Sequence, residues 1–324
     1  MTCTKKSETD CFIDFQMTKY DLTHAICSLP KVIYYLTIHN FLLWIRRFVL
    51  LFTADPKKNL NLKNKTLLIS GSSNGIGRQI VHDIFSLPKN HQPEQLILWD
   101  REESTENYEL LGSIKIVFQK IDLNNIGKID DALDFLSKNG KNIHIAILNA
   151  GFAQRKLFSE QTYPEYSSVM KVNTLANMHI SQKLLKTFKP EKILYTASVF
   201  SFNGYSYFAE YCASKAALRC FAEGLRQELR ICGVKTEILL ICPSPVETRF
   251  IDGMKNPNVN INLCLMQPSD ISFAVLKLIN HPELGIITVG WLFNVIYMLR
   301  PLFNQESLDA CYETIGFLNT GERE

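Results

Sequence analysis

Residues 65–77 read KTLLISGSSNGIG, a short apolar run that passes directly into a glycine-rich turn. The run Lys65–Ser70 predicts a buried strand, and the apolar spacing after the turn predicts a helix. The glycines of such a unit have separate tasks. Gly71 allows the tight turn, Gly75 lets the backbone approach a pyrophosphate, and Gly77 lets the helix pack close to the strand. Free N–H groups and the helix dipole favour an anion there, so the stretch predicts a phosphate-binding turn.

Strands and helices alternate on both sides of this turn, from Leu62 to Gly290. Further strands are predicted at Leu96–Trp99, Ile114–Ile121, Ile143–Leu148, Lys192–Thr196, Thr236–Ile241 and Ile286–Val289. Helices are predicted at Ile76–Phe85, Ile129–Ser137, Glu165–Lys186, Tyr211–Arg230 and Ser269–Ile279. This alternation is typical of right-handed βαβ units. Residues 62–290 are therefore expected to form a single α/β domain with a parallel sheet of about seven strands.

Apolar segments flank this domain on both sides. In the N-terminal extension, residues 1–61, Val32–Ala54 is long enough to span a bilayer, which takes about 20 apolar residues. Arg46 and Arg47 interrupt it, so an amphipathic helix at the membrane surface fits better than a span. Packing on the protein itself or on a second subunit is the alternative. In the tail, residues 291–324, Trp291–Phe303 is too short to span; we expect it to bury against the core or a partner, or to dip into a membrane face.

Composition excludes several classes of protein. Hydrophobic residues make up 46% and charged residues 21%, which is ordinary for a globular chain. The net charge of +3 arises in the first 60 residues and is too small for a nucleic-acid surface. The nine cysteines are scattered without a C-x-x-C, and the histidines show no ligand spacing, so neither a metal site nor a disulfide framework is expected. No secretory signal opens the chain. We expect a reducing, cytoplasmic setting, with the membrane surface as its alternative location.

Asp100 and Arg101 give opposite indications about whether the ligand carries a ribose 2′-hydroxyl or a 2′-phosphate. Asp100 closes the second strand, 23 residues after Gly77, near the spacing expected for an acid that binds a ribose 2′-hydroxyl. Its carboxylate would repel a 2′-phosphate, whereas Arg101 would attract one. Because the carboxylate lies at the strand end, we predict NAD as the cofactor and keep NADP as the alternative.

Tyr211 is the only tyrosine followed four residues later by a lysine, Lys215. On a helix, positions i and i+4 share a face. An ammonium beside a phenol favours the phenolate, and so does a positively charged nicotinamide ring, so together they would lower a pKa that starts near ~10. A phenol of that kind suits a general acid or base acting on an alcohol or carbonyl.

At this point the chain resembles the short-chain dehydrogenase/reductase family, over about Leu62–Val289. Its T-G-x-x-x-G-x-G, N-N-A-G and P-G-x-x-x-T motifs have counterparts, in order, in Ser70–Gly77, Leu148–Gly151 and Pro243–Thr248. Ser70, Leu148 and Ser244 replace the family's Thr, first Asn and Gly. Asp122-Leu123 resembles the pair that touches adenine. The family's four catalytic positions fall on Asn173, Ser198, Tyr211 and Lys215.

The resemblance implies a Rossmann-like, doubly wound fold and a division of work among those four residues. Ser198 would hydrogen-bond the substrate oxygen, and Tyr211 would transfer the proton. Lys215 would lower the pKa of Tyr211 and bind the nicotinamide ribose, and Asn173 would hold a water that links Lys215 to solvent. Besides Tyr211 and Lys215, the cofactor would contact Gly71, Ser73, Asn74, Gly75, Ile76, Gly77, Asp100, Arg101, Asp122, Leu123, Asn149, Ala150, Gly151, Pro243, Val246 and Thr248.

The expected activity is NAD(P)-dependent interconversion of a secondary alcohol and a ketone. The two apolar segments favour a lipid-like small-molecule substrate, for instance a steroid, retinoid or keto-lipid, and peripheral contact with a membrane. Specificity is expected in Arg249–Gln267, and the family's pairing helices predict a homodimer or homotetramer. The alternative is a dinucleotide-binding regulatory or scaffold protein without turnover.

Overall fold

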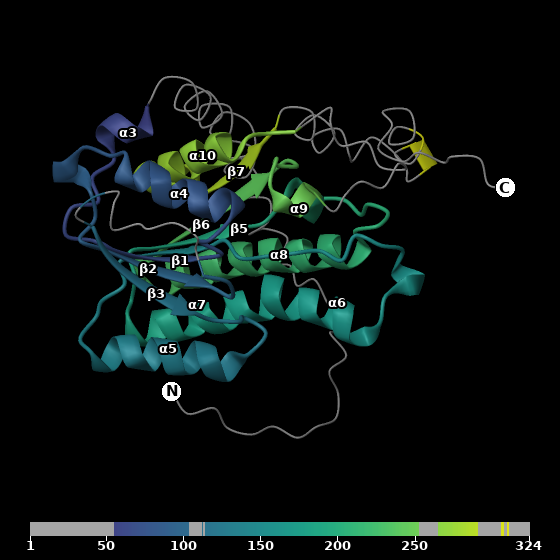
Figure 1. Cartoon of the computed structure of the whole chain (residues 1–324), viewed down its shortest axis with the longest axis horizontal. Helices are drawn as coiled ribbons and strands as arrows, with labels where there is room; N and C mark the ends of the chain where they lie inside the picture. Colours follow the sequence, from purple (N-terminus) through teal and green to yellow (C-terminus); the bar gives the residue numbers. More distant parts are fainter. Residues whose placement is uncertain are drawn as a thin grey trace, which may run out of the picture. The chain divides into compact units, whose positions relative to one another are not determined.

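A single parallel sheet forms the centre of the domain (Figure 1). The computed structural model describes residues 55–103, 112, 114–252, 265–290, 306, 307 and 310. The strands are β1 (Thr66–Ser70), β2 (Gln95–Asp100), β3 (Lys115–Lys120), β4 (Ile145–Leu148), β5 (Lys192–Thr196), β6 (Glu237–Pro243) and β7 (Ile286–Val289). Their order is β3-β2-β1-β4-β5-β6-β7, and every neighbouring pair is parallel. The predicted seven-stranded, doubly wound sheet is therefore confirmed.

The strand order reverses between β1 and β4. The chain passes outward from β1 through β2 to β3, then returns to β4 on the other side of β1 and continues to β7. In register, Ser70 at the end of β1 pairs with Leu148 on one side and with Trp99 on the other. The carboxyl ends of β1, β2 and β4 therefore lie together. In open α/β sheets, ligands bind in the crevice outside the strand ends at such a reversal point.

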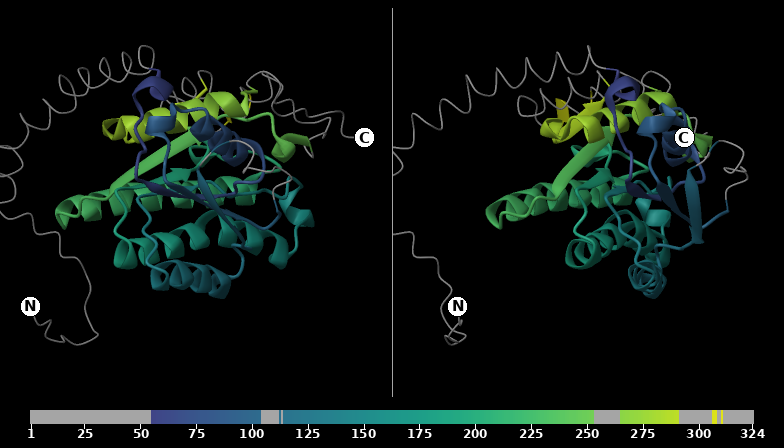
Figure 2. Two further views of the ribbon diagram at one scale, coloured as in Figure 1. Left: turned by 60° about the vertical axis from the view of Figure 1, so that its left-hand side comes forward. Right: turned by 90° about the vertical axis from the view of Figure 1, so that its left-hand side faces the viewer.

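Helices cover both faces of the sheet, which makes three layers (Figures 1 and 2). One face carries α4 (Gly75–Phe85) and α10 (Pro268–Asn280), with the short α3 (Pro56–Asn59) against α10. The other face carries α5 (Ile126–Lys138), α7 (Ala176–Thr187) and α8 (Ala209–Ile231). The shorter α-helices are α6 (Tyr163–Met170) and α9 (Arg249–Asp252). The 3₁₀ turns are η2 (Lys89–His91), η4 (Phe158–Glu160), η6 (Val199–Ser201) and η8 (Pro282–Leu284).

The helix predicted as continuous over Glu165–Lys186 is interrupted by a π-helical turn, η5 (Lys171–Leu175), between α6 and α7. Across this turn the N–H of Ala176 donates to the carbonyl of Lys171, five residues back. The Nδ2 of Asn177 donates to the carbonyl of Asn173 at 2.8 Å, which satisfies an acceptor within the turn. Apolar spacing cannot reveal such a turn, because one extra residue changes the backbone pairing more than the buried face.

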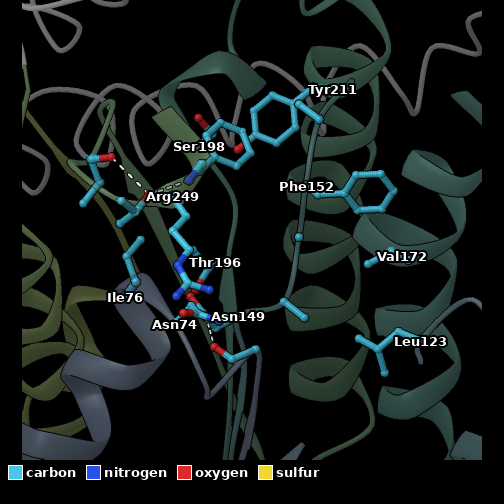
Figure 3. A pocket seen from close by; sticks show the side chains of 18 of the residues that line it. Asn74, Ile76, Leu123, Asn149, Phe152, Val172, Thr196, Ser198, Tyr211 and Arg249 are labelled. Atoms are coloured by element: carbon cyan, nitrogen blue, oxygen red, sulfur yellow. Dashed lines mark hydrogen bonds between the residues drawn. The ribbon is translucent and has the colours of Figure 1, made fainter. Parts of the chain in front are cut away.

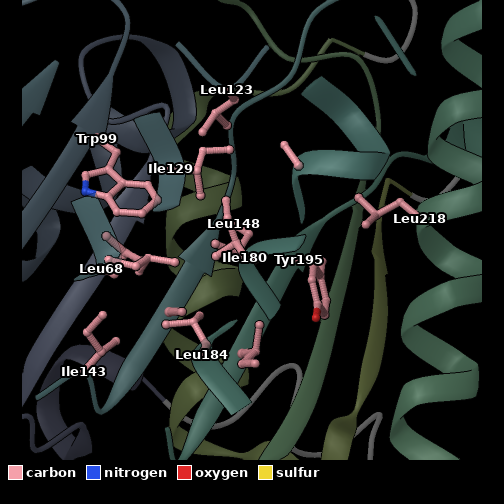
Figure 4. Close-up of a cluster of buried hydrophobic side chains, with 14 of the residues drawn as sticks. Leu68, Trp99, Leu123, Ile129, Ile143, Leu148, Ile180, Leu184, Tyr195 and Leu218 are labelled. Atoms are coloured by element: carbon pink, nitrogen blue, oxygen red, sulfur yellow. The ribbon is translucent and has the colours of Figure 1, made fainter. Parts of the chain in front are cut away.

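Apolar side chains from the strands and from helices α5, α7 and α8 fill the core between the sheet and these helices (Figure 4). All five residues of β1 are buried, which explains why its sequence is a continuous apolar run rather than an alternating one. Trp99, Leu148 and Tyr195 from three strands pack in this cluster with Ile180 of α7. The indole N–H of Trp99 donates to Oε1 of Gln119 at 2.8 Å, so its polar edge is satisfied although the ring is buried.

The apolar segments Val32–Ala54 and Trp291–Phe303 lie outside the described residues. Among the helices that the structure describes, none is both long and apolar enough to cross a bilayer. The last residues assigned to the N-terminal extension do have described structure. In α3, Lys57 Nζ pairs with Asp83 of α4 at 2.8 Å, which ties this turn to the face that carries α4 and α10.

Candidate active site

A pocket of about 440 Å³ lies at the carboxyl ends of the strands, across the point where the strand order reverses (Figure 3). Its lining includes Gly71 after β1, Asp100 at the end of β2, Asp122 after β3, Asn149 after β4 and Thr196 at the end of β5. Figure 3 shows Asn74 and Asn149 toward one end, and Ser198 and Tyr211 together at the other. Pro243 at the end of β6 also lines it, so the topology brings residues from six strand ends into one cavity.

The glycine-rich turn leaves bare backbone along one wall of this pocket. Gly71 and Gly75 have φ values of 68° and 54°, which disfavour any side chain there. A Cβ on Gly75 would lie 3.0 Å from Cγ2 of Thr248, and one on Gly77 would lie 1.9 Å from the carbonyl oxygen of Gly71. The turn is therefore a cradle that a side chain would fill, followed by the N-terminus of the eleven-residue helix α4. It fits the diphosphate of a dinucleotide.

The serine that replaces the family's threonine keeps the turn attached to the next wall. Ser70 Oγ accepts hydrogen bonds from the backbone N–H groups of Asn149 at 3.1 Å and Ala150 at 3.2 Å. Asn149 Nδ2 in turn donates to the carbonyl of Gly71 at 3.2 Å. A hydroxyl at position 70 is thus sufficient to hold the segment after β4 against the turn.

Asp100 presents a carboxylate at the end of β2. It accepts hydrogen bonds from the backbone N–H groups of Ser73 at 2.9 Å and Glu102 at 3.2 Å, which fix its position. Ser73 Oγ donates to the carbonyl of Glu102 at 2.8 Å. Arg101 is exposed and lies 3.6 Å from the Glu102 carboxylate. The pocket wall at the end of β2 therefore holds an ordered carboxylate and a cation that already has a partner.

The four residues expected to be catalytic lie close together. Lys215 Nζ lies 5.8 Å from the centre of the Tyr211 ring and donates to the carbonyl of Thr196 at 2.7 Å. Ser198 Oγ accepts from the N–H of Phe200 at 3.2 Å at the start of η6, which places its side chain beside Tyr211. The position of a Cβ on Gly151 would be 3.0 Å from Lys215 Nζ and 3.1 Å from Asn173 Oδ1.

Asn173 is fully buried behind this group. Its Nδ2 donates to the carbonyl of Phe152 and to Ser214 Oγ, both at 2.9 Å, and its Oδ1 accepts from the N–H of Phe152 at 3.0 Å. The π-helical turn η5 projects this amide toward the segment after β4. Asn173 therefore connects that segment to α8, the helix that carries Tyr211 and Lys215.

Burial dominates the acid–base properties of the pair. It raises the pKa of Tyr211 well above its usual value, while a hydrogen bond with Ser198 acts in the opposite direction. Burial also lowers the pKa of Lys215 to about 8. Of the protein groups, Ser198 lowers the pKa of Tyr211 and desolvation outweighs it, so the lowering expected from the neighbouring ammonium is not seen.

Three of the residues predicted to bind cofactor or catalyse do not line the pocket. Ser73 is buried and holds Asp100, Gly77 lies beneath the turn against Gly71, and Asn173 lies behind Gly151. The other residues predicted for the site do line it, namely Gly71, Asn74, Gly75, Ile76, Asp100, Arg101, Asp122, Leu123, Asn149, Ala150, Gly151, Ser198, Tyr211, Lys215, Pro243, Val246 and Thr248.

The structure adds apolar and cationic lining that the motifs do not contain. The ring of Phe250 lies 5.4 Å from that of Tyr211, and the guanidinium of Arg155 lies 5.5 Å from the centre of the Phe250 ring. Phe152 and Phe200 line the same cavity. Phe250 belongs to Arg249–Gln267, the segment in which specificity is expected. The other three residues follow strand ends outside the motifs, so only their position after β4 or β5 could have indicated them. No group of three or more potential metal-binding side chains occurs in the described part of the chain.

Comparisons with known proteins show the family of the chain. Residues 65–257 match the model of the short chain dehydrogenase family. The chain is 27% identical over 266 residues to a 17-beta-hydroxysteroid dehydrogenase 13 of Rattus norvegicus, covering 79% of this chain and 84% of that one. It is also 27% identical over 241 residues to an NADP-dependent 3-hydroxy acid dehydrogenase of Schizosaccharomyces pombe, covering 70% and 91%.

Among solved structures, the fold is similar to that of a short chain dehydrogenase from Burkholderia cenocepacia in complex with NADP. The TM-score is 0.63 at 18% identity, with 78% of this chain and 98% of that chain covered. At that identity the likeness concerns the fold. The family model matches more than half of the sequence and therefore shows the family, and the likeness in fold agrees with it. The chain belongs to the short-chain dehydrogenase family and is an NAD(P)-dependent dehydrogenase acting on CH–OH groups.

Proposed function

We propose that the protein interconverts a secondary alcohol and a ketone, with Tyr211 as the group that exchanges a proton with the substrate oxygen. The observation that carries this proposal is the grouping of Tyr211 and Ser198 at one end of the pocket, opposite the glycine-rich turn, with Lys215 Nζ 5.8 Å from the centre of the Tyr211 ring. The dinucleotide supplies or accepts the hydride. The protein's part is to orient the substrate oxygen, to exclude water and to manage one proton.

Each side chain has a task that its surroundings support. Tyr211 Oη donates its proton to a carbonyl oxygen during reduction and takes it back during oxidation. Ser198 holds the same oxygen by a hydrogen bond that strengthens as charge develops. Lys215 is held by the carbonyl of Thr196, and its ammonium would stabilise the phenolate left on Tyr211. Because burial raises the pKa of Tyr211, the positive charge of the oxidised nicotinamide ring is the second influence that would lower it.

A proton relay through Asn173 and Lys215 is supported by their close approach beside Gly151. Lys215 Nζ and Asn173 Oδ1 each lie about 3 Å from the point where a side chain on Gly151 would begin. The two polar groups therefore lie on the same side of Gly151, near enough to each other to share a chain of hydrogen bonds. We assign to Asn173 the water that connects Lys215 to solvent after Tyr211 has given up its proton.

The substrate that we propose is apolar and lipid-like. Phe152, Phe200 and Phe250 supply aromatic walls near Tyr211, and apolar surfaces of this kind bind apolar ligands. The apolar sequences Val32–Ala54 and Trp291–Phe303 support contact with a membrane surface from which such a substrate would be taken.

The exchange of Tyr211 for phenylalanine tests the proton-transfer assignment. Tyr211→Phe removes one hydroxyl and keeps the ring, so we expect kcat to fall by about 10²- to 10⁴-fold with dinucleotide affinity nearly unchanged. Tyr195→Phe is the matched control: its hydroxyl is buried against Ser181 outside the pocket, so turnover should persist. Turnover by Tyr211→Phe equal to that of the unaltered protein would show that another group moves the proton.

We further propose that NAD is preferred over NADP. The ordered carboxylate of Asp100 would accept a bond from a ribose 2′-hydroxyl and repel a 2′-phosphate. In fluorescence titrations, the unaltered protein is expected to bind NADH more tightly than NADPH. Asp100→Asn keeps the shape and an acceptor for Ser73, and should shift the ratio of affinities toward NADPH by about tenfold or more. Tighter binding of NADPH by the unaltered protein would contradict the preference.

A further inference from the structure

Arg249 is a pocket residue that no motif contains and to which the proposed chemistry assigns no task. It follows Thr248, whose Cγ2 lies 3.0 Å from the point where a side chain on Gly75 would begin. The start of α9 is therefore against the glycine-rich turn. Arg249 is itself exposed and lines the pocket. Figure 3 shows its side chain extending from this region toward the end of the pocket where Asn74 and Asn149 lie.

The glycine-rich turn has no positively charged side chain that could balance the charge of a bound diphosphate. Residues 70–77, SGSSNGIG, contain no charged side chain, so the turn offers only backbone N–H groups and the dipole of α4 to an anion. The diphosphate of a dinucleotide carries two negative charges. Desolvating them in a pocket is costly unless charged or hydrogen-bonding partners replace the lost water.

The other positively charged side chains of the pocket already have partners away from the glycine-rich turn. Lys215 donates to the carbonyl of Thr196 beside Tyr211. Arg155 donates to the carbonyl of Phe250, and its guanidinium lies over the ring of the same residue. Arg101 lies with Glu102 after β2. Among the residues that the structure describes, no carboxylate pairs with Arg249, so its guanidinium is the pocket cation available to the glycine-rich turn.

We propose that Arg249 binds the diphosphate of the dinucleotide, from the side opposite the backbone of residues 74–76. A guanidinium suits this task, because its planar fork makes charge-assisted hydrogen bonds to phosphate oxygens. Arg249 is thus a cofactor-binding residue supplied by the segment after β6. This inference rests on the proposed binding of NAD or NADP at the turn.

The direct test measures binding without turnover. ADP-ribose, which keeps the diphosphate and lacks the nicotinamide, is titrated into the full-length protein by calorimetry at constant ionic strength, with adenosine as the probe that has no phosphate. Arg249→Met should weaken ADP-ribose binding about 10- to 100-fold, the size of a charge-assisted hydrogen bond to a phosphate, and leave adenosine binding unchanged. Arg249→Lys should recover part of the loss.

Arg78→Met is the matched control. Arg78 is an exposed arginine in the first turn of α4, directly after Gly77, and it does not line the pocket. Removal of its charge should change the ADP-ribose affinity by less than about threefold, which is within the screened effect of a surface charge. Thermal unfolding of each unliganded variant checks that the fold is intact.

The two possible failures are distinguishable. If the unaltered protein binds ADP-ribose and Arg249→Met binds it equally well, or if Arg78→Met loses as much affinity, the assignment of Arg249 is wrong while the proposed function stands. If the unaltered protein binds neither ADP-ribose nor a dinucleotide, the proposed function itself fails.

Discussion

Tyr211 and Lys215 show how strongly burial controls a proton-transfer pair. The phenol keeps its proton more firmly than usual, and the ammonium holds its proton less firmly, with a pKa lowered to about 8. Both effects have the same cause, because a desolvated site disfavours the charged form of each group. A pair of this kind is poised to respond to a further charge in the pocket.

The titration of Lys215 has a measurable consequence for stability. Between pH 8 and its ordinary value of 10.5, the unfolded chain holds a proton on Lys215 that the folded chain has released. The free energy of unfolding therefore rises with pH in this window. For Lys215→Met we expect the difference, unaltered protein minus variant, to be constant below about pH 8 and to rise by up to about 3 kcal/mol at pH 10.5.

Urea unfolding at a series of pH values measures this difference. Tyr211 is present in both proteins, so its own titration largely cancels. A difference that stays flat across the whole window would mean that Lys215 keeps its proton in the folded state, and that burial does not govern its titration.

At the scale of elements, the contact between β1 and α4 depends on Gly77. A Cβ there would lie 1.9 Å from a backbone oxygen, so Gly77→Ala must push α4 away from the turn. We expect a loss of roughly 1–3 kcal/mol in the free energy of unfolding together with loss of dinucleotide binding. Both follow from urea unfolding and a titration with NADH.

Gly224 in α8 is the matched control for this substitution. A Cβ there meets nothing within 4 Å, so Gly224→Ala should raise the free energy of unfolding by roughly 0.5–1 kcal/mol through helix propensity, with binding unchanged. Equal effects of the two substitutions on stability and binding would refute the close packing at Gly77.

Strands could be predicted where they are buried on both faces, because their sequences are then rich in consecutive apolar residues. Lys65–Ser70 and Lys192–Thr196 are apolar because parallel strands are covered on both faces, and the structure places β1 and β5 there. The π-helical turn at Asn173 was not predictable, because it changes backbone hydrogen bonding without changing the apolar spacing. The helix expected over Glu165–Lys186 therefore appears as three pieces.

The site was predictable to the extent that motifs carry it. The glycine-rich turn and Tyr211 have sequence signals that depend only on local spacing. Arg249 and Phe250 lie in Arg249–Gln267, where specificity is expected, but no motif singles them out, because their place in the pocket depends on how the segment after β6 returns over the glycine-rich turn and Tyr211. The burial that raises the pKa of Tyr211 is likewise a property of the folded pocket.

At the scale of the whole molecule, the catalytic domain is one three-layered unit whose pocket opens at the strand ends. The sequence adds the apolar segments Val32–Ala54 and Trp291–Phe303 at its two ends. Arg46 and Arg47 would lie at the level of the headgroups if the first segment rests on a membrane. The membrane contact that we propose is therefore a property of the complete chain rather than of the domain.

Vesicle flotation tests this contact. We expect the full-length protein to float with vesicles that contain anionic lipid, and a chain that begins at Asp55 to float markedly less, because it lacks Val32–Ala54 with Arg46 and Arg47. Full-length protein that stays entirely in the soluble fraction, in flotation and after carbonate washing of membranes, would remove the membrane part of the proposal.

The central claim is that Tyr211 exchanges a proton with a substrate whose carbon exchanges a hydride with the bound dinucleotide. The most direct measurement supplies reduced dinucleotide deuterated at the transferred position, together with a panel of apolar ketones, and analyses the products by mass spectrometry. We predict deuterium at the carbinol carbon with the unaltered protein and with Tyr195→Phe, and transfer slowed by about 10²-fold or more with Tyr211→Phe. Deuterium transfer by Tyr211→Phe at the rate of the unaltered protein would contradict the account, as would a silent panel in the presence of bound, reduced dinucleotide.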